Sequence, residues 1–230
     1  PDGIPNLSDL ELPAAVAGFT RHANGLVLIT GPTGSGKTTT LAAMVDLINR
    51  TSGRHVITVE DPIEYSMDGV GQMQVNAKTD LTFARGLRAI LRQDPDVIMV
   101  GEIRDGETAR IAVESAMTGH LVLSTLHTNT AIGAVSRLID MGVERFLLAP
   151  MIRGLIAQRL VRRLCPDCRT EHALTASESA LLSRALPDGA PVFRAAGCDA
   201  CGQQGYRGRL PIYEIIQSDA ELEAMIHEGA

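Results

Sequence analysis

Aliphatic residues along the chain gather in short runs, and stretches with helical spacing separate these runs. The runs cover residues 26–30, 56–60, 97–100 and 121–125. Short runs rich in Val, Ile and Leu are typical of parallel strands that are buried on both faces. We therefore predict an α/β fold, in which helical crossovers join the strands of a parallel sheet.

Three stretches between or after these runs repeat apolar residues at the spacing of a helix. They cover residues 41–48, 83–91 and 132–139. Gly53 follows the first of them and Gly142 follows the last, as expected where helices end. The alternation of strand and helix signals is strongest in this part of the chain.

Changes in composition divide the chain into segments. The predicted segments are a lead-in or linker at 1–24, an α/β core at 25–163, a polar subdomain bounded by cysteine pairs at 164–209, and a helical C-terminal segment at 210–230. Residues 72–75 are predicted to form a side hairpin, because Gly69 and Gly71 precede them.

The composition limits the classes of function. The chain has 230 residues, of which 45% are hydrophobic, with no Trp and a formal net charge of −6. Negative charge, few aromatic rings and no lysine cluster argue against direct nucleic-acid binding. No apolar run reaches the roughly 18 residues of a membrane span, and the first residues lack the pattern of a signal peptide. Because the first residue is Pro1 and not Met, we expect a fragment of a longer protein.

Residues 31–38 fit the phosphate-loop pattern G-x-x-x-x-G-K-[ST]. The predicted ATP-binding residues are Gly31, Pro32, Thr33, Gly34, Ser35, Gly36, Lys37, Thr38 and Thr39. Glycines let successive N–H groups point at phosphate oxygens, and the following helix presents its N-terminus to the same anion. We expect Lys37 to reach the β and γ phosphates and Thr38 to bind Mg²⁺. The motif follows a predicted strand and begins a helix, which a simple glycine-rich turn would not require.

Acidic residues follow two of the predicted strands. The segment 60–64 begins with Glu60 and ends with Glu64, and Glu102 follows the strand at 97–100. Hydrolysis at a phosphate loop needs a group that orients water and an acid that holds Mg²⁺. Gly101 stands where the Walker B pattern usually has Asp, so Glu102 is expected to act alone. Solvated acids at strand ends remain the alternative interpretation.

Histidines and arginines supply further candidates. His120 precedes the predicted strand at 121–125, and His127 follows it at the position of a γ-phosphate sensor. Arg85, Arg88 and Arg92 share one helical face by their spacing. An arginine from this face is a candidate finger for the ATP of a neighbouring subunit. Structural roles for the histidines and a solvated arginine face remain open.

Four cysteines form two Cys-x-x-Cys pairs, Cys165 with Cys168 and Cys198 with Cys201. Four thiolates at this spacing are typical of a structural Zn²⁺ site with no open coordination position. The metal would hold together an insert that is too small for a core of its own. A redox dithiol or cysteines without metal are the alternatives.

The order of these motifs resembles the secretion ATPase superfamily, which includes type II secretion ATPases, type IV pilus extension and retraction ATPases and, more distantly, type IV secretion ATPases. The resemblance covers nearly the whole chain, and Gly101 is normal in this superfamily. The shared motifs are the phosphate loop at 31–38, the Asp box at 58–65, the Walker B stretch at 94–105 and the His box between 118 and 129.

The resemblance implies a RecA-like core in a hexameric ring, with ATP bound between subunits. It implies that Glu64 is the catalytic glutamate, that Glu102 holds Mg²⁺ through water, and that the arginine face makes contacts between subunits. Members of the superfamily carry an N-terminal domain that closes over the nucleotide. We expect that domain to lie outside these residues.

The cysteine pairs and the segments 155–162 and 205–209 resemble the type II secretion branch best. This implies ATP hydrolysis that drives pseudopilus assembly and protein export. The implied partners are inner-membrane secretion-platform proteins, and the implied place is the cytoplasmic face of the bacterial inner membrane, without a transmembrane segment of the chain's own. A pilus extension ATPase is the alternative, followed by a RecA-like nucleic-acid motor with a zinc module.

Overall fold

The computed structural model describes residues 3–182, 186–187 and 190–229. The chain forms two compact units, Pro1–Arg159 with Tyr213–Ala230, and Leu160–Ile212. The segments expected at 1–24, 164–209 and 210–230 include residues outside the described part, namely 1–2, 183–185 with 188–189, and 230.

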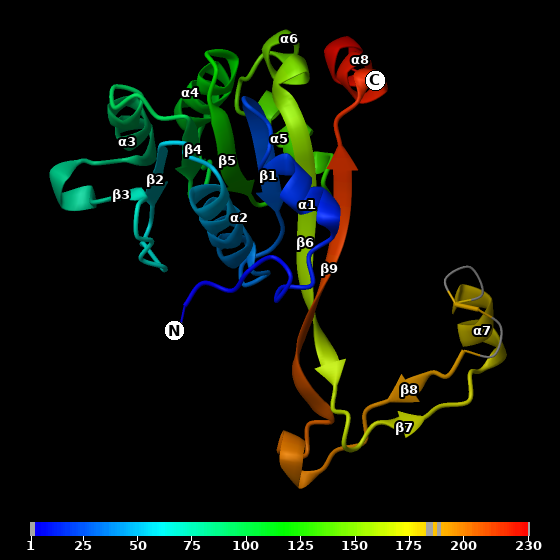
Figure 1. The fold of residues 1–230 in the computed structure, drawn as a ribbon. Coiled ribbons are helices and arrows are strands. Elements are labelled where there is room, and N and C mark those ends of the chain that lie inside the picture. Colours follow the sequence, from blue (N-terminus) through cyan, green and yellow to red (C-terminus); the bar gives the residue numbers. More distant parts are fainter. Residues whose placement is uncertain (1–2, 183–185, 188–189, 230) are drawn as a thin grey trace. The chain divides into compact units, whose positions relative to one another are not determined.

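A seven-stranded sheet forms the centre of the first unit, in the order β3-β2-β4-β5-β1-β6-β9 (Figure 1). The pairs β3–β2, β2–β4, β4–β5, β5–β1 and β1–β6 are all parallel. The strands are β1 (Gly25–Thr30), β2 (Val56–Glu60), β3 (Gly71–Gln74), β4 (Val97–Val100), β5 (Leu121–Leu126), β6 (Ile152–Leu164) and β9 (Tyr206–Gln217). Because these pairs are parallel, the carboxyl ends of β1, β2, β4 and β5 meet at one edge.

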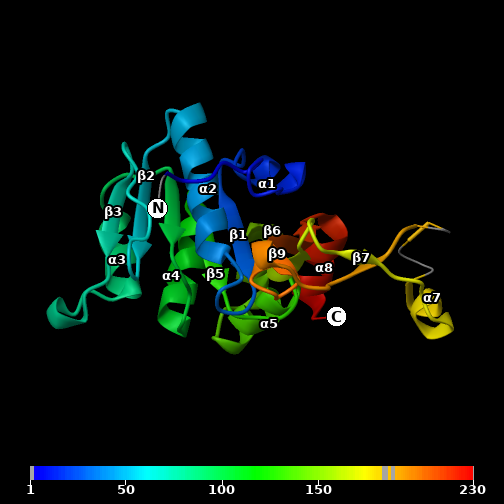
Figure 2. The ribbon, with the colours of Figure 1, turned by 90° about the horizontal axis from the view of Figure 1, so that it is seen from below.

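Helices cover both faces of this sheet (Figure 2). Side chains of α1 and α2 pack on one face, and side chains of α3, α4 and α5 pack on the other. The helices of this unit are α1 (Ala14–Phe19), α2 (Lys37–Thr51), α3 (Phe83–Ile90), α4 (Gly106–Met117), α5 (Gly133–Asp140), α6 (Arg145–Leu148) and α8 (Ala220–Glu228), with 3₁₀ turns η1 (Ala77–Thr79) and η2 (Ala149–Met151). This is the predicted α/β core.

Successive side chains along each strand point to opposite faces of the sheet, so the core is divided between the two faces. Leu26 and Leu28 of β1 pack towards α4, whereas Val27 and Ile29 pack towards α2. All four side chains are fully buried, so each contributes about 1.5–3 kcal/mol by leaving water. The central strands are therefore held rigidly from both sides, and so are the loops at their ends.

The structure differs from the sequence prediction in several elements. Residues 71–74 form β3, which pairs in parallel with β2 at the edge of the sheet and is not part of a hairpin. Within the described residues of the C-terminal segment, only Ala220–Glu228 is helical, because β9 continues to Gln217. The lead-in contains α1, whose Val16 and Phe19 are buried against α2. Among the described residues, no helix has the length and apolar character needed to cross a membrane.

The second unit has short elements and few buried side chains. Its small elements are β7 (Thr170–Glu171), α7 (Ala176–Leu182), β8 (Phe193–Arg194) and η3 (Asp199–Cys201). Glu178 accepts hydrogen bonds from the amide and hydroxyl of Thr175, from His172 and from Arg194. These donors, the Thr175 amide first, lower the pKa of Glu178 to about 2. Polar contacts of this kind take the place of a core in this unit.

Candidate nucleotide-binding site and cysteine cluster

The phosphate loop connects β1 to α2 and contains glycines in conformations that other residues avoid. Gly31, Gly34 and Gly36 have φ angles of +147°, +76° and +86°. A Cβ atom at Gly31 would lie 2.3 Å from the carbonyl oxygen of Gln158 on β6. Both the backbone conformation and the close neighbour thus require glycine at position 31.

The N-terminus of α2 is open to an anion. Gly36 is its N-cap residue in the left-handed conformation, and no side chain caps the first turn. The hydroxyl of Ser35 is buried and has no hydrogen-bond partner within the described part of the chain. Uncapped N–H groups at a helix start carry a partial positive charge. The loop therefore fits a phosphate group.

Lys37 lies inside the loop. Its Nζ donates hydrogen bonds to the carbonyl oxygens of Gly31 at 2.9 Å and Pro32 at 3.0 Å, and the residue is buried. Burial lowers the pKa of Lys37, and the nearby Glu102 carboxylate opposes this effect. The ammonium group is thus held beside the loop and within the electrostatic reach of Glu102.

The Asp-box loop after β2 lies next to the phosphate loop. The hydroxyls of Tyr65 and Thr39 are 3.5 Å apart, and Thr39 follows the half-buried Thr38. Glu64 immediately precedes Tyr65, and its side chain is exposed. Glu60 is buried instead, where it accepts hydrogen bonds from Thr58 and Gln72. Of the two glutamates in this segment, Glu64 is the one that solvent and a substrate can reach.

Glu102 follows β4 and is held by β5. Thr125 accepts a hydrogen bond from the Ile103 amide and donates one to the Gly101 carbonyl, so both neighbours of Glu102 are fixed. The Glu102 carboxylate accepts a hydrogen bond from Arg104 and lies 3.3 Å from Nε2 of His127. The hydrogen bond from Arg104 is the main cause that lowers the pKa of Glu102.

Arg104 is a member of this site that the sequence reading missed. Its guanidinium pairs with Glu102 and also with Asp61 at 3.4 Å, and it lies over the ring of Phe83. The signal available in the sequence was a positively charged residue two positions after Glu102, the candidate Mg²⁺ ligand. Arg104 joins the acids that follow β2 and β4.

The two histidines lie at opposite ends of β5. His127 follows its carboxyl end, which is the edge that carries the phosphate loop and Glu102. His120 precedes its amino end, where Nδ1 hydrogen-bonds to the carbonyl of Ser115 at 2.9 Å. His120 therefore has a structural contact, whereas His127 belongs to the candidate site.

The candidate arginines are exposed on and after α3. Arg85 pairs with Asp80, and Arg88 pairs with Glu107 of α4 at 2.6 Å. Arg92 follows the helix and is exposed. These ion pairs engage Arg85 and Arg88 away from the phosphate loop of their own chain.

The four cysteines of the second unit come together. All four sulfur atoms lie within 4.8 Å of one another, and three of the separations are 3.8, 3.9 and 4.0 Å. A tetrahedral metal site with bonds of about 2.3 Å has sulfur–sulfur edges of about 3.8 Å. The thiols are free and too far apart for a disulfide, so the arrangement fits a metal.

Backbone amides surround this cluster. Gly197 donates to the sulfur of Cys168, and Gly205 donates to the sulfur of Cys201 at 3.1 Å. Burial alone would raise the pKa of Cys201, but N–H donors of Cys198 and Gly205 and the neighbouring thiols lower it to about 6. The hydrogen bond from the backbone of Cys201 lowers the pKa of Cys198, but burial and the neighbouring thiols outweigh it and raise that pKa to about 11. A thiolate is the form that binds a metal.

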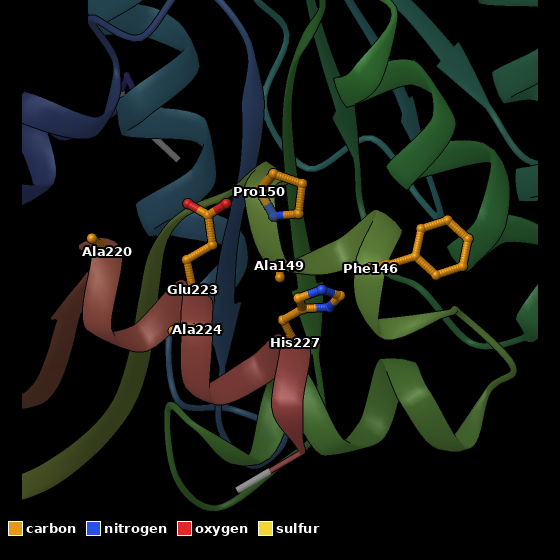
Figure 3. Close-up of a pocket in the computed structure, with 7 residues that line it drawn as sticks. All are labelled: Phe146, Ala149, Pro150, Ala220, Glu223, Ala224 and His227. Carbon is orange, nitrogen blue, oxygen red and sulfur yellow. The ribbon is translucent and has the colours of Figure 1, made fainter.

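A separate pocket of about 470 Å³ lies in the first unit between α8 and the segment of α6 and η2 (Figure 3). Its lining residues are Phe146, Ala149, Pro150, Ala220, Glu223, Ala224 and His227. None of the predicted nucleotide-binding residues is among them. The pocket is thus distinct from the phosphate loop.

Curated relatives match most of this chain. Type II secretion system protein E of Pseudomonas aeruginosa is 59% identical over 209 residues, which are 90% of this chain and 41% of the relative. Type II secretion system ATPase E of Vibrio cholerae is 55% identical over 210 residues, covering 91% and 42%. The chain spans less than half the length of these relatives.

Solved structures share the fold. The pilus retraction motor PilT with bound ADP matches with a TM-score of 0.76 and 37% identity, covering 100% of this chain and 57% of that chain. The ATPase DotB of Legionella pneumophila matches with a TM-score of 0.72 and 30% identity, covering 98% and 54%. The family model described as "Type II/IV secretion system protein" matches residues 9–230, and the chain belongs to this family.

Proposed function

We propose that the chain binds ATP with Mg²⁺ and hydrolyses it to ADP and phosphate. The observation that carries this proposal is the uncapped N-terminus of α2 behind a glycine loop, with Lys37 and Glu102 beside it. This combination presents N–H donors and an ammonium group to a triphosphate. A carboxylate stands close enough to act electrostatically on the same site.

The residues of the loop have separate roles in this proposal. The backbone N–H groups of residues 31–39, apart from Pro32, which has no N–H, bind the phosphates, and Lys37 neutralises the β and γ oxygens. Thr38 and Glu102 hold Mg²⁺, which supplies charge neutralisation of the phosphate oxygens when bound. Arg104 keeps the Glu102 carboxylate ionised and oriented.

Glu64 orients the attacking water in this proposal. Its exposed carboxylate follows β2, and the contact between Tyr65 and Thr39 supports a position of this loop beside the nucleotide. His127 senses the γ-phosphate through its contact with Glu102. The exposed arginines at 85, 88 and 92 act on the ATP of a neighbouring copy in a hexameric homo-oligomer.

We further propose that Cys165, Cys168, Cys198 and Cys201 hold one structural Zn²⁺. The sulfur separations and the amide donors support four thiolate ligands. Four protein ligands leave no position for substrate, so the role is to stabilise the second unit.

For the whole protein, we propose that hydrolysis powers pseudopilus assembly and export by a type II secretion system. The relatives at 55–59% identity are named for that system, whereas the pilus retraction motor is 37% identical. The partners are then platform proteins of the inner membrane, and the protein acts on the cytoplasmic face without binding nucleic acid. The full-length protein should restore secretion, but not piliation, in a strain from which its gene has been deleted. That result would support a type II secretion system over a pilus extension motor.

ATP-binding titrations and ATPase assays on the full-length protein test the proposed chemistry. Lys37→Ala should abolish detectable ATP binding, while Lys78→Ala, at an exposed lysine, should not change it. Glu64→Gln should keep ATP binding and lower kcat by at least about 100-fold, the range expected for loss of a general base. Glu221→Gln on the exposed face of α8 is the matched control. Full activity of both Lys37→Ala and Glu64→Gln would contradict the assigned roles.

A further inference from the structure

Gln158 is a buried polar residue whose contacts the proposed chemistry does not use. It lies on β6, where Ile156 and Ala157 precede it, and only 3% of its surface is exposed. β6 pairs with β1, with Ile29 opposite Ile156 and Thr30 opposite Ala157. Gln158 therefore lies beside the point where β1 ends and the phosphate loop begins.

The side-chain amide of Gln158 connects the loop to the following helix. Its Nε2 donates a hydrogen bond to the carbonyl oxygen of Ser35 at 2.7 Å. Its Oε1 accepts a hydrogen bond from the hydroxyl of Thr40 at 2.8 Å. The Ser35 carbonyl can only accept, so it fixes which end of the amide faces the loop.

The contact with Ser35 has a consequence for the next amide in the chain. A peptide unit is planar and trans, so the carbonyl of Ser35 and the N–H of Gly36 point in opposite directions. When Gln158 holds the carbonyl towards β6, the Gly36 N–H points away from β6. Gly36 is the N-cap of α2, so this N–H belongs to the group of donors that face an anion.

We propose that Gln158 is a positioning residue for nucleotide binding: it holds the Ser35–Gly36 peptide so that the Gly36 N–H points at the phosphates. This rests on the proposed binding of ATP at the same loop. Gln158 does not touch the nucleotide. Without this contact the peptide unit is free to rotate, and the site loses a donor and leaves a buried carbonyl unpaired.

Two substitutions in the full-length protein separate the donor from the shape of the side chain. Gln158→Met keeps the approximate length and removes both hydrogen bonds. Gln158→Glu keeps the shape and the acceptor for Thr40 but, when ionised, turns an oxygen towards the Ser35 carbonyl. Calorimetric titration should show Kd values for Mg-ADP and Mg-ATP raised by about tenfold in both variants at pH 8.5, the effect of one lost hydrogen bond.

The pH dependence of the Kd of Gln158→Glu tests the donor, when the number of binding sites per chain stays constant between pH 8.5 and 6. A protonated glutamate has an O–H that can donate to Ser35, and burial favours this neutral form. The affinity of Gln158→Glu should therefore recover towards that of the wild type as the pH falls from 8.5 to 6, whereas Gln158→Met should not recover. Lys37 is the charged residue at the same junction, and Gln158→Met, which keeps Lys37 and adds no carboxylate, reports the pH dependence that is not due to the new glutamate.

Two further variants provide matched controls. Gln217→Glu makes the same substitution at an exposed position of β9 and should leave the Kd unchanged. Thr40→Val removes only the hydrogen bond to Oε1, so its Kd should rise by less than about threefold, because the Ser35 contact remains.

Specific results would overturn this proposal. A Kd within about twofold of the wild type in folded Gln158→Met, or fewer binding sites at an unchanged Kd, would make Gln158 an ordinary core residue, because the proposal requires a tenfold effect from one hydrogen bond. Equal pH dependence of Gln158→Glu and the wild type would do the same. The binding site itself is tested separately, since loss of binding in Lys37→Ala together with normal binding in Gln158→Met refutes the positioning role alone.

Discussion

The two units of this chain hold their functional residues in different ways. In the first unit, the candidate site residues follow strands that are buried on both faces, and the core fixes the ends of those strands. In the second unit, Cys165 is the one buried hydrophobic side chain among the described residues of 160–212. The first site is therefore a product of the fold, whereas the second site has to create the order around it.

Local contacts replace the core in the second unit. Four thiols converge, Glu178 accepts several hydrogen bonds, and Arg162 lies over the ring of Tyr206 at 3.8 Å. The contacts of Glu178 and Arg162 are exposed to water, where a cation–π contact contributes only about 0.5–1 kcal/mol. Such contributions do not order some fifty residues, so the cysteine cluster is expected to supply most of the stability.

The largest expected effect is therefore that of metal removal on the second unit. One zinc per chain should be measured by elemental analysis, and Cys201→Ser should lose it. Structural zinc sites in small domains contribute about 10–16 kcal/mol of apparent binding free energy. We expect trypsin to cut rapidly after Arg163, Arg169 and Arg194 once the metal is removed, with the fragments identified by mass spectrometry.

The first unit serves as the internal control in that experiment. Mg-ADP binding should persist in Cys201→Ser, and so should the part of the far-UV circular dichroism signal that comes from the helices of the first unit. The reason is that the core of the first unit contains none of the cysteines. A metal-free Cys201→Ser protein that resists trypsin as well as the wild type does would show that the second unit folds without metal.

The second expected effect is that of a cavity in the core of the first unit. Ile98 of β4 is fully buried, and Ile98→Ala should lower the free energy of unfolding by about 2–5 kcal/mol. The chain has no Trp, so urea unfolding is followed by circular dichroism. Ile132→Ala makes the same change at a side chain that is 42% exposed and should cost less than about 1 kcal/mol. Equal losses in the two variants would contradict a stability that comes from the two-sided core.

Most of the first site was predictable from the sequence because its parts are local. The phosphate loop is one continuous motif, and Glu102 and His127 each follow an apolar run, so strand ends alone bring them to one edge. The spacing of the cysteines likewise predicted their convergence, which is confirmed. In each case the chemistry and the local backbone signal lie within a few residues of each other.

The parts that could not be predicted depend on residues far apart in the chain. Gln158 reaches Ser35 only because β6 pairs with β1, and Arg104 reaches Asp61 only because β2 and β4 are neighbours. Helix α4 was missed since its buried face consists largely of small residues such as Ala109 and Ala112, which give a weak periodic signal. These long-range contacts depend on the order of the strands in the sheet, which cannot be read from the sequence.

The smallest expected effect concerns the surface of the first unit. Arg88 and Glu107 form an ion pair between α3 and α4, with side chains that are 48% and 53% exposed. A double-mutant cycle with Arg88→Ala and Glu107→Ala should give a coupling energy of about 0.2–1 kcal/mol in urea unfolding, because water screens exposed pairs. The coupling should shrink further in 1 M salt, where the screening length is about 3 Å. A coupling above about 2 kcal/mol would mean that this surface ion pair stabilises α3 as much as the core does. A small coupling together with a large loss of ATPase activity in Arg88→Ala would instead assign Arg88 to the nucleotide of a neighbouring subunit.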